Sequence, residues 1–209
     1  MGSFRTLITV PGWATDSRLF EGVSFPFESV VHVHDCMGIE SQDQIVAAVQ
    51  TAAFLGPVSV LGFSMGGFAV VECLPQIQDQ VTQVILVGIR QRYPQSEIDQ
   101  VKSLISAGKA RFLRSFYKSG FPSRVWQPLF DSYLAQWDEA ALCAGLDRLG
   151  SLEIKPEALL CPEKITVVHG LQDAIAPIAE ARVLAQAAGA KWQEIEGPHY
   201  LPLDRVVFF

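Results

Sequence analysis

Residues 58–71 read VSVLGFSMGGFAVV, and this stretch decides the fold of the chain. An apolar, β-branched run breaks at Gly62, presents Ser64, and resumes as a longer apolar segment after Gly66. This pattern predicts a strand, a sharp turn and a helix. Gly-x-Ser-x-Gly turns too tightly for side chains at the flanking positions, so the spacing predicts a strained serine at the carboxyl end of a strand. An ordinary glycine-rich turn in a parallel sheet has the same spacing, so the rest of the chain must decide.

The rest of the chain alternates between short β-branched runs and helical patterns. The expected strands cover residues 6–10, 30–34, 58–61, 82–87, 165–169 and 192–195, and the expected helices cover residues 41–55, 65–75 and 176–188. Alternation of this kind predicts an α/β fold with a mostly parallel, doubly wound sheet of about six strands. Ligand sites in such folds lie at the carboxyl ends of the strands, which is where Ser64 falls.

Residues 89–150 interrupt this alternation, because they show helical patterns and no convincing strand. They also contain nine of the 21 aromatic residues of the chain. We therefore expect an α/β core formed by residues 1–88 and 151–209, with residues 89–150 inserted as a helical cap, or lid, subdomain.

Composition narrows the class of protein. Charged residues interrupt every apolar run before the roughly 18 residues that a membrane helix needs, and the first residues lack a secretion signal. We expect a cytoplasmic protein without a membrane partner, and a monomer by default. The cysteines are far apart and lack metal-ligand spacing, so we expect reduced thiols, no metal and no organic cofactor. The net charge of −6 argues against nucleic acid as a partner.

The charge is unevenly distributed along the chain. Residues 89–127 hold eight basic and two acidic residues, which is a net charge of +6, so the remainder carries −12. This division predicts a positive surface that meets an acidic partner or an anionic substrate. A solvated helix face without any partner is the alternative.

A serine hydroxyl needs a base to become a nucleophile at neutral pH, and histidine is the natural base. His199 follows the last expected strand in a Gly-Pro-His loop, from which it can reach the serine. We expect His32 and His34 to be packing or rim residues, because they lie on the second strand. His169 ends the strand over residues 165–169 and is expected to be structural.

The base in turn needs an acid to orient it. Asp173 lies in the loop after the strand that ends at His169. Its alternative role is that of a helix cap, because a helix begins just downstream. The chain order of Ser64, Asp173 and His199 is the order of nucleophile, acid and base expected of this architecture.

These motifs together resemble the α/β-hydrolase superfamily over nearly the whole chain. Residues 62–67 are similar to its nucleophile elbow, residues 170–173 to its acid loop, and residues 197–199 to its histidine loop. Within the superfamily, the chain most resembles the pimeloyl-ACP methyl ester carboxylesterases of biotin synthesis. Residues 11–13 resemble the strand-end turn of that family, and residues 111–113 and 145–152 resemble parts of its cap.

The resemblance implies a serine carboxylesterase that acts through a Ser-His-Asp triad. It implies an oxyanion hole made by the backbone amides of Trp13 and Met65, and an acyl channel lined by Trp13, Phe112 and Phe116. Ordinary core packing is the alternative role for these aromatic rings. The implied contacts to an acyl carrier protein are basic residues of the cap, namely Arg111, Arg114, Lys118 and Arg124.

Two features depart from the family pattern. The family usually has His-Gly-Trp where this chain has Pro11-Gly12-Trp13, and proline has no amide donor. The sequence also stops ten residues after His199, before the final helix usual in the superfamily, so we expect a shortened or an incomplete version. The alternatives on the same fold are a thioesterase, an acyltransferase, a lipase-like hydrolase, and a non-catalytic binding protein.

Overall fold

The computed structural model describes residues 4–38, 40–121 and 126–208, and its centre is one parallel sheet. The strands run in the order β2-β1-β3-β4-β5-β6. Their bounds are β1 Thr6–Val10, β2 Ser29–His32, β3 Val58–Phe63, β4 Val81–Val87, β5 Ile165–Gly170 and β6 Lys191–Ile195. The parallel six-stranded sheet expected from the sequence is confirmed.

Burial along the strands explains why the central strands appear in the sequence as continuous apolar runs. Every residue of β1, β3 and β5 is buried, whereas the edge strands β2 and β6 are largely exposed or half-buried. Central strands of a parallel sheet are covered on both faces and so read as continuous apolar runs. The edge strand β2 lies slightly earlier than residues 30–34, where its weaker pattern placed it.

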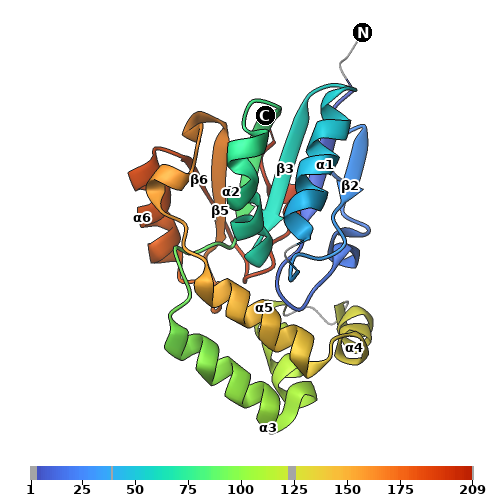
Figure 1. Ribbon diagram of the computed structural model, residues 1–209, viewed down its shortest axis with the longest axis vertical. Helices are drawn as coiled ribbons and strands as arrows, with labels where there is room; N and C mark the ends of the chain where they lie inside the picture. The colour runs from blue at the N-terminus through green and yellow to red at the C-terminus, as the bar shows by residue number, and fades with distance from the viewer. Residues whose placement is uncertain (1–3, 39, 122–125, 209) are drawn as a thin grey trace.

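Three helices of the core connect these strands. They are α1 Ser41–Ala53, α2 Met65–Ile77 and α6 Ile178–Ala188. Figure 1 shows α1 and α2 side by side in front of the sheet. The α2 helix continues two residues beyond Pro75, where we expected it to end. Most of α2 is buried, and the free energy gained by this burial offsets the cost of the backbone hydrogen bond that Pro75 cannot donate.

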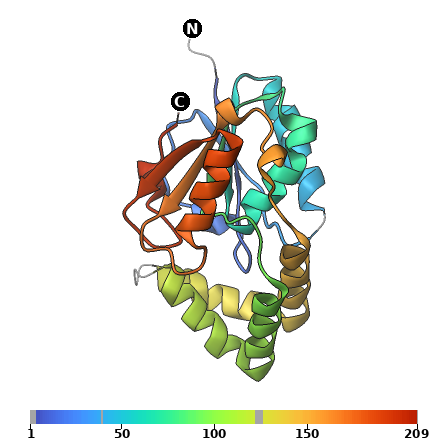
Figure 2. The same cartoon turned by 90° about the vertical axis from the view of Figure 1, so that its left-hand side faces the viewer.

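The insertion between β4 and β5 is helical, as expected. It consists of α3 Gln95–Gly120, α4 Gln127–Gln136 and α5 Glu139–Ser151. The backbone of α3 is non-helical at Gly108, which divides this helix in two. Figures 1 and 2 show these three helices as a cap beyond one end of the sheet, opposite the end at which the N-terminus lies. The cap therefore covers the carboxyl ends of the strands, where ligand sites of parallel sheets form.

Shorter turns complete the chain. They are the 3-10 segments η1 Ser17–Phe20, η3 Pro156–Ala158, η4 Pro162–Lys164 and η5 Leu203–Arg205. Within the described ranges, no helix combines the length and the apolar character that crossing a membrane requires.

Candidate active site

Ser64 occupies the turn between β3 and α2. Its backbone has φ 52° and ψ −121°, and a positive φ is rare for a residue with a side chain. The Ser64 amide donates to the carbonyl of Val87 at 2.8 Å, which ties the turn to the end of β4. A non-glycine residue in this region of backbone space costs on the order of 1–3 kcal/mol and persists only where its surroundings hold it.

Glycines around the serine allow that close packing. A Cβ atom at Gly62 would lie 2.7 Å from the carbonyl oxygen of Gly66, and a Cβ atom at Gly66 would lie 2.4 Å from the carbonyl oxygens of Val10 and Pro11. Real Cβ atoms do not approach other atoms so closely, so both positions require glycine. The second contact also brings the end of β1 against the serine turn.

Asp173 and His199 form a buried pair at the ends of β5 and β6. The Nδ1 atom of His199 and the Oδ2 atom of Asp173 are 2.7 Å apart, and neither side chain is more than 2% exposed. The Oδ1 atom of Asp173 accepts the amides of Ile175 and Ala176 at 2.8 and 2.9 Å. One carboxylate thus serves both of the roles that its sequence position allows: it binds the imidazole and it caps the turn before α6.

The charge state of this pair follows from its surroundings. Burial opposes ionisation of Asp173, but the hydrogen bonds to His199 and to the two amides outweigh it and lower the pKa of the carboxyl group. An ionised carboxylate only accepts hydrogen bonds, so His199 carries its proton on Nδ1. In a neutral imidazole the other ring nitrogen, Nε2, is then free to accept a proton.

The His199 ring lies next to the serine turn. Its centroid is 5.0 Å from that of Phe63, the residue before Ser64. A Cβ atom added at Gly88 would be 3.1 Å from Cε1 of the imidazole, and Gly88 directly follows the carbonyl that holds the Ser64 amide. The histidine ring therefore lies beside Phe63 and Gly88, at the ends of β3 and β4 between which the Ser64 amide is held.

The turn after β1 forms the other side of the site. A Cβ atom at Gly12 would lie 3.1 Å from the Cβ atom of Ser64. The backbone amides of Trp13 and Met65 donate no hydrogen bond to any residue in the described part of the chain. Met65 begins α2, and free amides at a helix N-terminus favour an anion.

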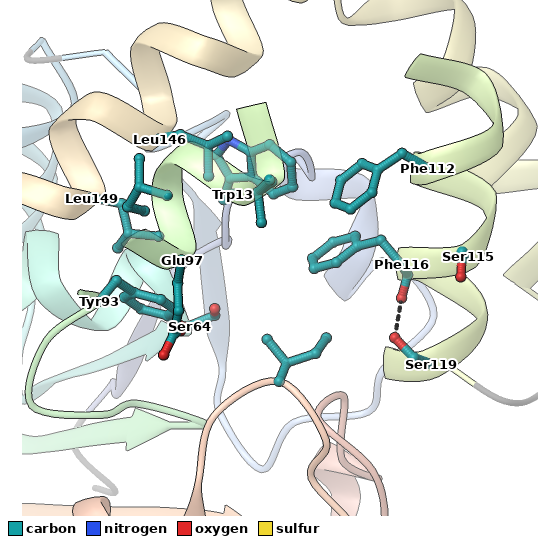
Figure 3. Close-up of a pocket in the computed structure, with 13 residues that line it drawn as sticks. Trp13, Ser64, Tyr93, Glu97, Phe112, Ser115, Phe116, Ser119, Leu146 and Leu149 are labelled. Carbon is teal, nitrogen blue, oxygen red and sulfur yellow. Dashed lines mark hydrogen bonds between the residues drawn. The ribbon is translucent and has the colours of Figure 1, made fainter. Parts of the chain in front are cut away.

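A cavity of about 280 Å³ opens between the core and the cap, with Ser64 on its wall. Figure 3 shows Phe112 and Phe116 of α3 on one side of this space, with Trp13 nearby. The structure thus places all three aromatic residues expected along the channel on the cavity wall. The ring of Trp13 packs edge-on against Phe116, with centroids 5.3 Å apart.

Most of the remaining wall could not be inferred from sequence motifs. It is formed by helical or loop residues that were not singled out as lining candidates, although Leu146 and Leu149 lie in the cap-like run of residues 145–152; these residues are Tyr93, Glu97, Ile98, Val101, Ser115, Ser119, Leu146, Leu149 and Ile175. The signals in the sequence were the density of aromatic residues in the insertion and the cap-like run of residues 145–152. The wall is largely apolar, which suits an acyl chain or a similarly apolar group.

The basic residues of the cap divide into two groups. Arg111, Arg114 and Lys118 are exposed on α3 and make no ion pair with any described residue, while Arg124 lies outside the described residues. Arg90, which the charge count included, is instead buried and pairs with Glu97 and Glu180. A count of charges along a segment cannot separate these two environments.

The other three histidines lie at the end of β2, just after it, and in β5. His169 is fully buried, its Nδ1 atom is 3.5 Å from the Oδ2 atom of Asp173, and burial lowers its pKa. His32 shares a 2.6 Å hydrogen bond with Thr9 on the sheet, and His34 is exposed. No cluster of three side chains suited to hold a metal ion occurs among the described residues.

No family model matches the sequence, but a curated protein and several solved structures are similar to it. Over 236 aligned positions, the chain is 23% identical to the pimeloyl-[acyl-carrier protein] methyl ester esterase of Nitrosomonas europaea, an alignment that covers all of this chain and 88% of that protein.

Solved structures resemble the chain over almost its whole length. An esterase from Exiguobacterium antarcticum aligns with a TM-score of 0.75 at 18% identity, covering 95% of this chain and 86% of the esterase. The enol-lactonase from Burkholderia xenovorans aligns with a TM-score of 0.72 at 16% identity, covering 95% of this chain and 85% of the lactonase. The parallel sheet, the serine turn and these neighbours together show that the chain has the α/β-hydrolase fold.

Proposed function

We propose that this chain is a serine carboxylesterase with Ser64 as nucleophile, His199 as general base and Asp173 as the acid that orients it. The observation that carries the proposal is the 2.7 Å contact between Asp173 and His199 at strand ends beside a strained serine turn. A strained serine, a histidine and a buried carboxylate in this chain order are the components of acyl-transfer chemistry.

The mechanism follows from the proton positions. The hydroxyl of Ser64 attacks the ester carbonyl while Nε2 of His199 takes its proton, and Asp173 stabilises the imidazolium that forms. The amides of Met65 and Trp13 donate to the oxyanion of the tetrahedral intermediate. His199 then protonates the leaving alcohol, which leaves an acyl group on Ser64. A water molecule, deprotonated by His199, attacks this acyl group, and the acid is released as the serine regains its proton.

Hydrolysis of p-nitrophenyl hexanoate tests this reaction. We expect a burst of nitrophenol, and we expect kcat of Ser64→Ala and His199→Ala to fall by about 10⁴-fold or more. Ser103→Ala and His34→Ala change exposed residues of the same types and should keep the wild-type rate. Equal rates in wild-type, Ser64→Ala and His199→Ala proteins would refute the proposal. Failure of a fluorophosphonate to label Ser64 would favour a non-catalytic binding protein.

For the substrate, we propose pimeloyl-ACP methyl ester in biotin synthesis. Two observations support it: the similarity to the esterase from N. europaea, and an apolar cavity beside a basic helix face. On α3, Phe112 and Phe116 face the cavity, while Arg111, Arg114 and Lys118 are exposed and available to an acidic carrier protein. Arg124 belongs to the same proposed surface by its sequence position only.

Charge reversal separates carrier binding from chemistry. In a variant with Arg111→Glu, Arg114→Glu and Lys118→Glu, we expect KM for the carrier-bound ester to rise by about tenfold or more at low salt. Its KM for p-nitrophenyl hexanoate should not change, because that ester has no carrier. An unchanged KM for both esters would remove the carrier surface from the proposal.

The biological role has its own test. We expect the gene to restore growth of a biotin auxotroph that lacks its own esterase, and failure with a well-expressed protein would contradict the role in biotin synthesis. Comparing an oxygen ester with the thiol ester of the same acyl chain distinguishes an esterase from a thioesterase. The serine chemistry itself would survive either result.

A further inference from the structure

The turn after β1 is hydrogen-bonded to α3, α4 and α5 of the cap. Three contacts reach it from α5, α3 and α4 in turn: Nε1 of Trp13 donates to the Leu142 carbonyl at 3.0 Å, the Tyr117 hydroxyl donates to the Ala14 carbonyl at 2.6 Å, and the Tyr133 hydroxyl donates to Oδ1 of Asp16 at 3.1 Å. The contacts fall on neighbouring residues of one short turn, although their partners are spread over residues 117–142. A turn of the core is thus held from outside the core.

These contacts are out of reach of water. Ala14, Asp16 and Tyr133 are fully buried, and Tyr117 is 1% exposed. Burial raises the pKa of both tyrosines, so their hydroxyl groups keep their protons and remain donors at neutral pH. A buried hydrogen bond cannot be replaced by one to solvent, so each contact fixes the position of the turn.

The turn has particular need of such support. Ala14 has φ 57°, a left-handed conformation that alanine rarely adopts, and this residue directly follows Trp13. Pro11 can donate no amide hydrogen bond to brace the start of the turn. Within the turn, Thr15 does donate its hydroxyl to the Gly12 carbonyl at 2.9 Å.

The Asp16 end of the turn is tied to α4 by charge as well. The guanidinium of Arg18 bonds both carboxylate oxygens of Asp16 at 2.7–3.1 Å, and its Nη1 reaches the Ser132 hydroxyl at 3.0 Å. The same guanidinium lies 4.9 Å from the centre of the Tyr133 ring. The Tyr133 hydroxyl therefore bonds a carboxylate that Arg18 already holds, and Arg18 is itself bonded to α4.

We propose that Tyr117 and Tyr133 are positioning residues for the Trp13 amide, so that the cap holds the oxyanion turn in its working geometry. This inference rests on the proposed function, in which the Trp13 amide donates to the oxyanion. Neither tyrosine is among the residues that line the cavity, so neither is expected to bind the substrate. Loss of either hydroxyl should therefore reduce kcat and leave KM nearly unchanged.

Phenylalanine substitutions remove the hydroxyls and keep the rings. For Tyr117→Phe and Tyr133→Phe we expect kcat on p-nitrophenyl hexanoate to fall by about tenfold to a hundredfold with KM within about twofold, the range that small misplacements of catalytic groups produce. Affinity for a trifluoromethyl ketone of the same chain length, which forms a tetrahedral adduct with the serine, should fall by the same factor. Affinity for hexanoate, the planar product, should not change.

Tyr200→Phe is the matched control. Its buried hydroxyl donates to the Leu19 carbonyl at 2.7 Å, so this variant loses a buried hydrogen bond of the same kind that does not reach residues 11–16. We expect it to lose stability and keep the wild-type kcat. Rates are compared where thermal unfolding shows each protein folded, and if one variant does not fold, the other tests the same inference through a different helix.

The possible results separate cleanly. Wild-type kcat in both tyrosine variants would overturn the inference, as would equal losses in the two variants and Tyr200→Phe. Equal loss of affinity for the ketone and for hexanoate would also overturn it. An inactive wild-type protein would instead refute the proposed function, so the two failures are distinguishable.

Discussion

The two turns that meet at Ser64 are held by different parts of the molecule. The serine turn of residues 62–67 is fixed within the core. Its glycines pack against the end of β1, and the Ser64 amide donates a hydrogen bond to β4. The turn of residues 11–16 is also a strained strand end, but its hydrogen bonds reach α3, α4 and α5 of the cap. The turn of the proposed nucleophile is thus fixed by the core alone, and the proposed oxyanion turn is held by both core and cap.

This difference predicts that the two turns respond differently to substitutions in the cap and in the core. Substitutions in the cap should leave the backbone strain of Ser64 untouched and should act on Trp13 and on the cavity wall. Substitutions in the serine turn should disturb both, because its glycines pack directly on Val10 and Pro11. We therefore expect substitutions in the serine turn to reduce mainly stability, and substitutions in the cap to reduce mainly the catalytic rate.

The largest effect is expected from Gly66→Ala. Its Cβ atom would lie 2.4 Å from two backbone carbonyl oxygens, which cannot rotate away as a side chain can. We expect the free energy of unfolding to fall by about 3 kcal/mol or more, because overpacking forces the backbone to shift. Chemical denaturation measures this change. Gly38→Ala meets nothing within 4 Å and should stay within about 0.5 kcal/mol of wild type; a similar loss in both variants would contradict core fixation of the serine turn.

The same division shows how far the sequence could be read. The serine turn obeys a local rule, so its glycine spacing predicted the strand, the strained serine and the helix that the structure contains. Asp173 and His199 could be placed at strand ends because alternation of strands and helices predicts a parallel sheet. Their 2.7 Å contact then follows from the adjacent positions of β5 and β6.

The contributions of the cap could not be read in this way. Tyr117 and Tyr133 were visible only as aromatic residues of a helical insertion, because their partners lie 103 and 117 positions away in the sequence. Arg90 counted as a surface cation, yet it is buried between two carboxylates. Contacts between separate units of a fold depend on how the units dock, and no local pattern encodes that.

An intermediate effect, dependent on pH, is expected from Asp16→Asn. Burial opposes ionisation of Asp16, but its bonds with Arg18 outweigh burial and lower the pKa of the carboxyl group in the folded protein. A lowered pKa contributes stability above the pKa of the unfolded chain, about 3.9, and that contribution is lost as pH falls through the folded pKa. We expect the variant to be about 2 kcal/mol less stable at pH 7, because the half-buried Arg18 guanidinium loses its buried carboxylate partner.

The measurement is the unfolding free energy of both proteins from pH 7 to pH 2.5. The difference between wild type and Asp16→Asn should narrow below about pH 4, where the aspartate of the wild type becomes protonated. Asp79→Asn changes an exposed carboxyl group with no ion pair to a described residue and should track wild type throughout. A gap that stays constant across this range would mean that Asp16 supports the turn by shape and not by charge.

The smallest effect on stability, and the sharpest separation of rate from stability, is expected from Gly145→Ala in α5. Its Cβ atom would lie 3.0 Å from Cδ1 of Trp13 and 3.2 Å from Sδ of Met37, so the indole must move by a few tenths of an ångström. Replacing glycine by alanine inside a helix contributes about 1 kcal/mol, and overpacking costs about as much. The two contributions offset each other, so thermal unfolding should be nearly unchanged.

The catalytic rate should nevertheless change. The indole of Trp13 is hydrogen-bonded to the Leu142 carbonyl, so a shift of the indole should also shift the backbone amide of Trp13. We expect kcat on p-nitrophenyl hexanoate to fall by about threefold to tenfold, less than for the tyrosine variants because no hydrogen bond is removed. Gly150→Ala on the same helix crowds Ile98 at 3.0 Å instead of Trp13, so it should change KM and leave kcat alone. A kcat loss of equal size in the two variants would show that the cap acts on the reaction through the cavity wall in general, and not through the turn after β1.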